Sequence, residues 1–165
     1  MVEVCLQQLG KLPGPELENA MDRESYSLTA GLALGLITMG RGEALAVGSL
    51  ADLHLPNLLH NYMLGGPRPK LSNSMLDRPQ SDQIKEGDNI NTDITSPGAT
   101  LALGMMYWNS GNENIAAWMN APDTMFLLDF VRPDFLMLRT LAKGLILWDR
   151  ILPSVEWVES QVRLK

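Results

Sequence analysis

The stretch GATLALGMMYW, residues 98–108, decides the fold, because the chain repeats it with small changes. Residues 138–148 read LRTLAKGLILW and share five identical positions with it, at an offset of 144 − 104 = 40 residues. Residues 29–39, TAGLALGLITM, also share five positions, at an offset of 104 − 35 = 69 residues. A repeat of roughly 35–45 residues is typical of stacked helix pairs. The sequence therefore predicts an all-α fold, a segment of an α-solenoid or toroid built from helix-pair repeats of about 40 residues.

A long insertion explains why the first offset exceeds the second. Residues 65–97 are rich in Gly, Pro, Ser, Asn and Asp, and removing about 30 of them brings the offset of 69 close to 40. We expect residues 66–88 to be poorly ordered or outside the helical stack, and Ile90, Thr92 and Ile94 to form a short strand. The predicted parts are an N-terminal segment and linker over 1–24, repeat 1 over 25–64, the loop insertion over 65–97, repeat 2 over 98–133, and an incomplete repeat 3 over 134–165.

Local signals predict where the helices begin and end. Ser25 is a candidate N-cap for a helix over 26–39, which the glycine at position 40 would end. The helix of repeat 2 is expected to start near Gly98, with Pro97 at its first turn, and Asp123 is expected to cap a short helix. The third repeat helix is predicted over 134–148.

The same glycine recurs in all three repeats, at Gly35, Gly104 and Gly144. A glycine inside a helix costs about 1 kcal/mol relative to alanine, so its recurrence needs a cause. We expect equivalent buried positions where a neighbouring helix comes close; a glycine-lined binding groove is the functional alternative. Helix 26–39 is apolar nearly all round and is expected to be buried, and the four tryptophans are expected to be wedges in the core.

Composition argues against several classes of partner and location. The formal net charge of −6 argues against nucleic acid, which requires clustered Lys and Arg. The longest apolar runs are about ten residues, half of what a membrane crossing needs. The start of the chain has no secretory signal pattern. Cys5 is the single cysteine, which excludes an intramolecular disulfide and favours a reducing compartment.

Motifs for catalysis or cofactor binding are weak. Gly40-Arg41-Gly42 follows a predicted helix rather than a strand, so it does not fit a dinucleotide site. His54 and His60 lack companion ligands for a metal, and no Ser/His/Asp or Cys/His set has a local signature. Ser96-Pro97 is the one Ser-Pro or Thr-Pro step, a minimal signal for phosphorylation. We expect no catalytic residue, no cofactor and no metal.

Specific phrases resemble a known family. GLALGLITMG and GATLALGMMYW resemble the proteasome/cyclosome repeat. The longer phrases PGPELENAMDRESYSLTAGLALG, IKEGDNINTDITSPGATLALGM and IAAWMNAPDTMFLLDFVRPDFLMLRTLAKGLILWDRILP resemble the repeat region of the anaphase-promoting complex (cyclosome) subunit 1 family. The resemblance covers nearly the whole chain beyond the first ten residues. Because members of that family are much longer, this chain is expected to be a fragment or short form.

The resemblance implies a scaffold rather than an enzyme. It implies a toroid of paired helices within a cell-cycle ubiquitin ligase active in mitosis, in the nucleus and cytoplasm. The implied partners are other subunits of that complex, namely its cullin/RING module and its tetratricopeptide-repeat subunits, without nucleic acid or membrane. The alternatives are a scaffold subunit of the proteasome regulatory particle, with the same fold, and a small helical enzyme or ligand carrier.

Overall fold

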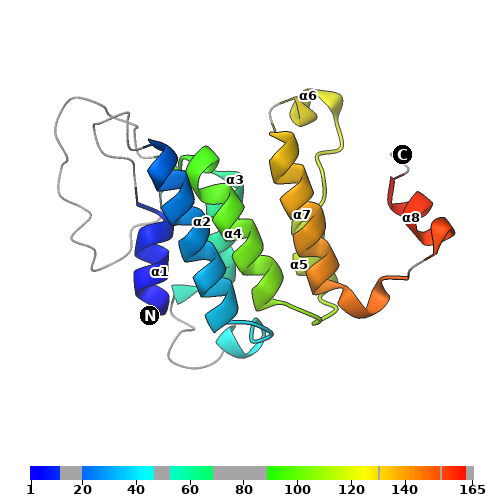
Figure 1. Cartoon of the computed structure of the whole chain (residues 1–165), viewed down its shortest axis with the longest axis horizontal. Helices are drawn as coiled ribbons and strands as arrows, with labels where there is room; N and C mark the ends of the chain where they lie inside the picture. Colours follow the sequence, from blue (N-terminus) through cyan, green and yellow to red (C-terminus); the bar gives the residue numbers. More distant parts are fainter. Residues whose placement is uncertain (12–19, 47–52, 69–88, 130, 153, 163–165) are drawn as a thin grey trace.

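The chain folds into helices joined by turns (Figure 1). The computed structural model describes residues 1–11, 20–46, 53–68, 89–129, 131–152 and 154–162. The predicted all-α class is confirmed, because the described residues contain helices and one isolated antiparallel bridge, between Pro67 and Asn89. The α-helices are Val2–Leu9 (α1), Ala20–Ile37 (α2), Leu55–Leu64 (α3), Thr92–Met106 (α4), Glu113–Trp118 (α5), Met125–Leu128 (α6), Pro133–Ile146 (α7) and Val155–Val162 (α8). Short 3-10 turns lie at Ala44–Ala46 and Trp148–Arg150.

The helices form two layers. Helices α1, α2, α4 and α7 lie side by side in a front row, in which α2, α4 and α7 run in the same direction (Figure 1). Helices α3 and α5 form a back layer, where α3 packs against α4 and α5 packs against α7. The parallel direction of α2, α4 and α7 is what a repeated helix pair requires, because each return helix brings the chain back to the same end of the stack.

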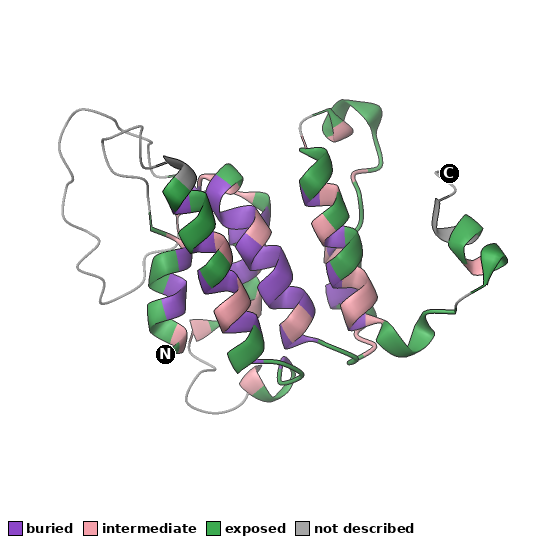
Figure 2. Cartoon of the chain, in the orientation of Figure 1, coloured by how far each residue is buried: buried purple, intermediate pink, exposed green. Residues whose placement is uncertain are grey.

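The core lies around α4. Figure 2 shows α4 buried over most of its length, whereas α7 and α8 carry exposed surface. Leu34 of α2, Leu59 of α3, Leu103 and Met106 of α4, and Ile146 of α7 are fully buried. Each such side chain contributes about 1.5–3 kcal/mol by leaving water. The front row and the back layer are therefore held together mainly through the middle helix.

Helix α4 begins earlier than the sequence predicts. It starts at Thr92, so the expected strand over 90–94 and the expected start near Gly98 are both wrong. The Asn91 side chain caps the helix by accepting from the Asp93 N–H at 3.2 Å. Pro97 lies inside the helix, where its missing N–H removes one hydrogen bond that the cap and the packing of α4 offset. Residues 92–97 thus belong to the helix rather than to the insertion.

Two predicted caps are also wrong. Helix α2 begins at Ala20, so Ser25 lies within it rather than at its N-cap. Helix α6 is capped by Thr124, whose side chain accepts from the Leu127 N–H, and not by Asp123. At α6 the neighbouring Thr124 offers cap chemistry equivalent to that of Asp123, which a sequence pattern does not distinguish. The expected disorder of residues 66–88 falls mainly on 69–88, which lie outside the described residues.

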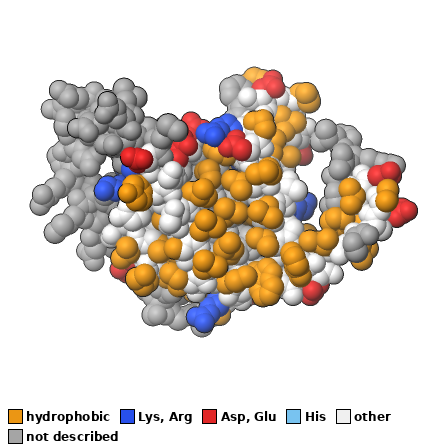
Figure 3. All heavy atoms as spheres, viewed as in Figure 1, with side chains coloured by type: hydrophobic (Ala, Val, Ile, Leu, Met, Phe, Trp, Pro, Cys, Tyr) orange, Lys and Arg blue, Asp and Glu red, His pale blue; other side chains and the backbone are white. Residues whose placement is uncertain are grey.

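Burial is one-sided, which corrects two further expectations. Leu36 of α2 is 62% exposed and Trp148 is 52% exposed, and Trp108 is also exposed. Neither α2 nor these two tryptophans are enclosed as predicted, because the back layer covers only one side of the front row. Figure 3 shows the opposite side, where apolar side chains extend across α2, α4 and α7.

Candidate protein–protein interface

The repeat glycines set the distance between helices of the front row. Gly35 of α2 is buried, and a Cβ added there would lie 3.2 Å from Ala102 Cα and 2.8 Å from Met105 Sδ of α4. Gly104 of α4 is buried in turn, and its added Cβ would lie 2.8 Å from both Cα and Cβ of Ala142 on α7. Ala102 and Ala142 are equivalent repeat positions, since 142 − 102 = 40. The same glycine-to-alanine contact is therefore made twice.

The third glycine differs from the other two. Gly144 of α7 is half-buried, and the one described atom within 4 Å of its added Cβ is Ile151 Cδ1 at 3.7 Å. Equivalent burial against a neighbouring helix therefore holds for Gly35 and Gly104 but not for Gly144. The physical reason is position, because α7 is the last helix of the front row in the described part of the chain.

Helices α2 and α4 approach most closely nearer their N-terminal ends. A Cβ added to Gly98 would lie 2.6 Å from the carbonyl oxygen of Ser27, and one added to Gly31 would overlap the backbone of Gly98. The two helices thus meet backbone to backbone at this point. Gly31 and Gly35 form a GxxxG pair, and both glycines lie where α2 packs against α4.

A backbone clamp joins the turn after α2 to the end of α4. The Gly40 N–H donates to the Met105 carbonyl at 3.1 Å, and the Gly42 N–H donates to the Met106 carbonyl at 2.9 Å. These carbonyls belong to the last turn of α4, where the regular hydrogen bonds of the helix run out, and the Met105 carbonyl also accepts from the Trp108 N–H at 3.1 Å. The turn of one repeat therefore caps the helix of the next.

The turn after α4 clamps the end of α7 in the same way. The Asn109 N–H donates to the Leu145 carbonyl at 2.8 Å, and the Gly111 N–H donates to the Ile146 carbonyl at 3.0 Å. Asn109 and Gly111 have positive φ angles of 53° and 65°, which glycine and asparagine adopt at least cost. The two pairs of donor residues are 69 positions apart in the sequence, and the two pairs of acceptor residues are 40 positions apart. These are the same two offsets that relate the copies of the sequence repeat. The sequence analysis did not predict this clamp. The recurrence of Gly or Asn at the equivalent positions 40 and 109, and of Gly at 42 and 111, is the feature of the sequence that indicates it.

The turn after α7 does not continue the clamp. Asp149 and Ile151 stand where the earlier turns have Asn109 and Gly111. The Asp149 N–H donates to Asn109 Oδ1 at 3.2 Å, and the Ile151 N–H donates to the Trp148 carbonyl at 3.2 Å. Arg150 pairs with Glu113 at the start of α5. This turn is therefore fastened to repeat 2 and caps no further helix among the described residues.

The open side of α7 carries an apolar groove of about 550 Å³. Exposed apolar side chains on this side include Met137 and Leu141. The groove is lined by Met137, Thr140, Leu141, Gly144, Leu145, Trp148, Ile151 and Trp157. It combines large apolar side chains with one glycine and no charged group, which is the chemistry of a surface that packs against protein.

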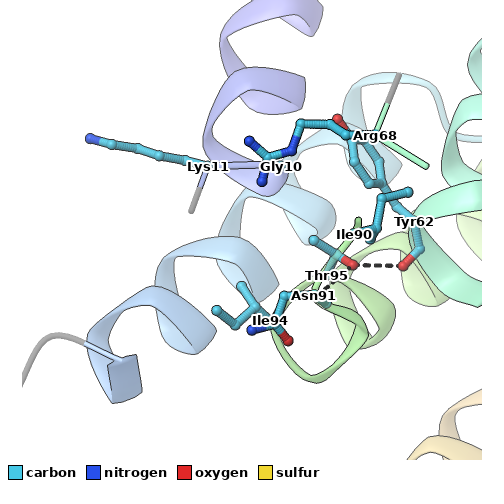
Figure 4. Close-up of a pocket in the computed structure, with 8 residues that line it drawn as sticks. All are labelled: Gly10, Lys11, Tyr62, Arg68, Ile90, Asn91, Ile94 and Thr95. Atoms are coloured by element: carbon cyan, nitrogen blue, oxygen red, sulfur yellow. Dashed lines mark hydrogen bonds between the residues drawn. The ribbon is translucent and has the colours of Figure 1, made fainter. Parts of the chain in front are cut away.

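A second hollow has a structural role. It lies where the end of α1 meets α3 and α4 and measures about 10 Å³, room for no more than one water molecule. Figure 4 shows Thr95 in it, with its hydroxyl donating to the Tyr62 carbonyl at 2.7 Å. This bond ties α4 to the last turn of α3. The hollow is too small for a ligand.

The other residues singled out from the sequence have structural surroundings. Ser96 is buried inside α4, so a kinase cannot reach it in the folded chain. Cys5 is a buried free thiol. His54 precedes α3 in a left-handed conformation, with φ 44°. His60 stacks on Trp118, with ring centroids 4.1 Å apart. Among the described residues, no group of three or more His, Cys, Asp or Glu side chains could hold a metal.

Burial and charge act together on His60. Burial lowers the pKa of its imidazole, and the nearby positive charge of Arg139 lowers the pKa further. Both effects favour the neutral form of the stacked ring. No helix in the described ranges is long and apolar enough to span a bilayer.

Comparison with known proteins gives a consistent family. The sequence matches the family described as the APC1 fifth domain over residues 1–165. It is similar to anaphase-promoting complex subunit 1 of Homo sapiens, with 54% identity over 162 residues, covering 97% of this chain and 8% of the relative. It is 42% identical over 163 residues to the Arabidopsis thaliana subunit 1, and this match covers 98% of this chain and 9% of that relative. A relative from Emericella nidulans, 32% identical over 160 residues and covered to 7%, is named negative regulator of mitosis.

The chain therefore spans less than a tenth of the length of these relatives. The match nevertheless extends over the whole sequence, including all three copies of the repeated glycine motif. Together with the stacked helices, it establishes that the chain belongs to the APC1 fifth-domain family.

Proposed function

We propose that this chain is a non-catalytic scaffold segment of an anaphase-promoting complex subunit 1. The observation that carries the proposal is the 54% identity to named subunits of that complex over 97% of the chain. The segment would help to join the tetratricopeptide-repeat subunits to the cullin/RING module of a ubiquitin ligase, in the nucleus and cytoplasm. Stacked helices with apolar sides fit a role in holding other proteins.

The open side of α7 gives this role a physical basis. Its groove has a glycine at the position where α2 and α4 each receive the next helix. We propose that a further helix of the same subunit packs there, with a small residue above Gly144. Such packing would cover the apolar groove and extend the front row.

The test uses the full-length subunit, tagged at its natural locus and purified with its partners. A Gly104→Leu variant should overpack the contact with Ala142, and the yield of cullin/RING and tetratricopeptide-repeat subunits should fall together with ubiquitin transfer. His54→Gln, an exposed change outside the front row, is the matched control. Co-purification of proteasome ATPase subunits instead would assign the scaffold to the proteasome. Loss of ubiquitin transfer from a fully assembled complex would contradict a purely non-catalytic role.

A further inference from the structure

Helix α6 presents three large apolar side chains to solvent, which together are called the α6 patch. Met125 is 74% exposed, Phe126 is 71% exposed and Leu127 is 50% exposed. The helix lies beyond the N-terminal end of α7, at one tip of the molecule (Figure 1). Three consecutive apolar side chains with this exposure are typical of a surface that packs against another protein, in which Met and Phe are enriched.

The backbone under the α6 patch is a closed helical turn. The Leu128 N–H donates to the Thr124 carbonyl at 3.0 Å, and the Asp129 N–H donates to the Met125 carbonyl at 3.1 Å. The Thr124 side chain caps the turn by accepting from the Leu127 N–H at 3.3 Å. The patch is therefore already ordered, so that a partner would not have to pay for arranging it.

Two carboxylates border the α6 patch. Asp123 comes two residues before Met125, and Asp129 lies one helical turn after Met125 on the same side. Both are exposed, and neither pairs with a cation among the described residues. Figure 3 shows apolar and acidic side chains together at this tip. The patch is thus an apolar surface with a negative rim.

No nearby cation balances this rim. Arg132 is the one Lys or Arg between positions 119 and 134. Its guanidinium donates to both carboxylate oxygens of Asp134, at 3.1 Å and 2.8 Å, and lies 3.9 Å from Asp93. Lys143 lies in the last turn of α7, at the end away from α6. The charge that complements the patch must therefore come from its partner.

We propose that the α6 patch docks a segment of a neighbouring subunit in which apolar side chains are flanked by Lys or Arg. The apolar side chains would pack on Met125, Phe126 and Leu127, and the cations would pair with Asp123 and Asp129. Burial of the patch supplies the affinity, and the rim pairs supply specificity and faster association. This inference rests on the proposed scaffold role only in taking the partner to be another subunit of the same complex.

Other occupants fit the α6 patch less well. In a symmetric dimer the same surface is used twice, so a second copy would bring the carboxylates of two patches together. The further helix proposed above α7 would fill a groove that no residue of α6 lines. Nucleic acids and anionic membranes carry the same sign of charge as the rim. A basic and apolar protein segment has none of these conflicts.

The first experiment identifies the occupant in the intact complex. Phe126 is replaced by p-benzoylphenylalanine in the full-length subunit, and the purified complex is irradiated and analysed by mass spectrometry. We expect a cross-linked peptide from another subunit, with Lys or Arg next to its apolar residues. The same replacement at Leu36, an exposed position on α2, should not yield this peptide. Cross-linking to the same subunit, to a second copy or to an acidic segment would overturn the proposal, as would the absence of any cross-link.

The second experiment tests the chemistry by titrating the 165-residue chain with three capped heptapeptides. The first repeats one lysine and two leucines, the second has glutamate for lysine, and the third has glutamine for leucine. The lysine–leucine peptide should bind at least about tenfold more tightly than the other two. Phe126→Ser should weaken this binding by about tenfold, and Leu36→Ser should change it less than about twofold. Changing both Asp123→Lys and Asp129→Lys should reverse the preference between lysine and glutamate.

The titration contradicts the proposal in three cases. They are equal binding of the lysine and glutamate peptides, an equal loss in Leu36→Ser, and an unchanged preference after both aspartates become lysine. If Phe126→Ser does not fold, the peptide preference of the wild-type chain and the cross-link decide. Failure of both experiments with normal co-purification of the partner subunits would reject the docking site and leave the scaffold role in place.

Discussion

At the scale of single residues, small side chains determine how closely the helices approach. Glycine at position 104 weakens α4 locally by about 1 kcal/mol relative to alanine. A methyl group there would lie 2.8 Å from Ala142 Cα, a distance that forces the two helices apart. The packing gain therefore outweighs the local cost at Gly104. At Gly144 the glycine weakens the helix in the same way, but no neighbouring helix packs closely against it in the described structure.

This contrast predicts opposite effects of one substitution at two equivalent positions. In the 165-residue chain, Gly104→Ala should lower the free energy of unfolding by about 1–3 kcal/mol through overpacking. Gly144→Ala should leave it unchanged or raise it by up to about 1 kcal/mol, because the added methyl meets Ile151 Cδ1 at an ordinary contact distance of 3.7 Å and helix propensity improves. Urea denaturation of the two variants measures both effects.

The same pair of variants also tests the proposed helix above α7. In a longer protein that includes the segment following this chain, Gly144→Ala should become destabilising, as Gly104→Ala is. A Gly144→Ala change that stays neutral in the longer protein would show that no helix packs closely over Gly144.

His60 predicts a dependence of stability on pH. Burial and Arg139 hold its pKa in the folded chain below the usual value, so the unfolded chain binds more protons as the pH falls through the region near 6.5. This contribution to stability is fully present above pH 6.5 and is lost on acidification. Thermal unfolding from pH 7.5 to 5.5 should show a steeper loss for wild type than for His60→Phe, which keeps an aromatic ring on Trp118. His54→Gln controls for the removal of a histidine.

At the scale of elements, the clamp explains why two turns have well-defined conformations. The turns after α2 and α4 each supply two backbone donors to the last carbonyls of the following front-row helix. The turn after α7 contains Asp149 and Ile151 at those positions and bonds to repeat 2 and to itself. Stability should therefore differ between turns that look equivalent in the sequence repeat.

Amide hydrogen exchange measures this difference. The Gly42 and Gly111 N–H groups should exchange slowly although they lie in turns, because each bonds to a helix carbonyl of another repeat. The Ile151 N–H, whose acceptor Trp148 lies three residues away, should exchange much faster. Equal rates at Gly111 and Ile151 would contradict the clamp.

The sequence predicts the helices better than their ends or their long-range bonds. The repeated glycine motif and the apolar spacing correctly indicate α2, α3, α4 and α7. The start of α4 was missed because Pro97 resembles a first-turn proline, whereas the actual cap is Asn91. The clamp was missed because it depends on which residues from different repeats come together. Spacing along one helix does not reveal that.

At the scale of the whole molecule, the apolar groove on α7 predicts self-association. The Leu141 side chain, 51% exposed, should bury itself against another copy when no further helix covers it. Leu141→Lys should shift the chain toward monomer in sedimentation velocity with little change in its unfolding midpoint. Tyr26→Lys, an exposed change on α2 within the row, is the matched control. A monomeric wild type at high concentration that also unfolds cooperatively above about 60 °C would indicate a self-contained domain.

In both clamps the donor residues come before the acceptor residues in the sequence, so the ribosome synthesises the donors first. The turn at Gly40 and Gly42 is made before α4, and the turn at Asn109 and Gly111 is made before α7. Each front-row helix after α2 therefore emerges from the exit tunnel when the donors for its last carbonyls are already present. The growing chain can add one finished repeat at a time, without waiting for later sequence to cap the helix just made.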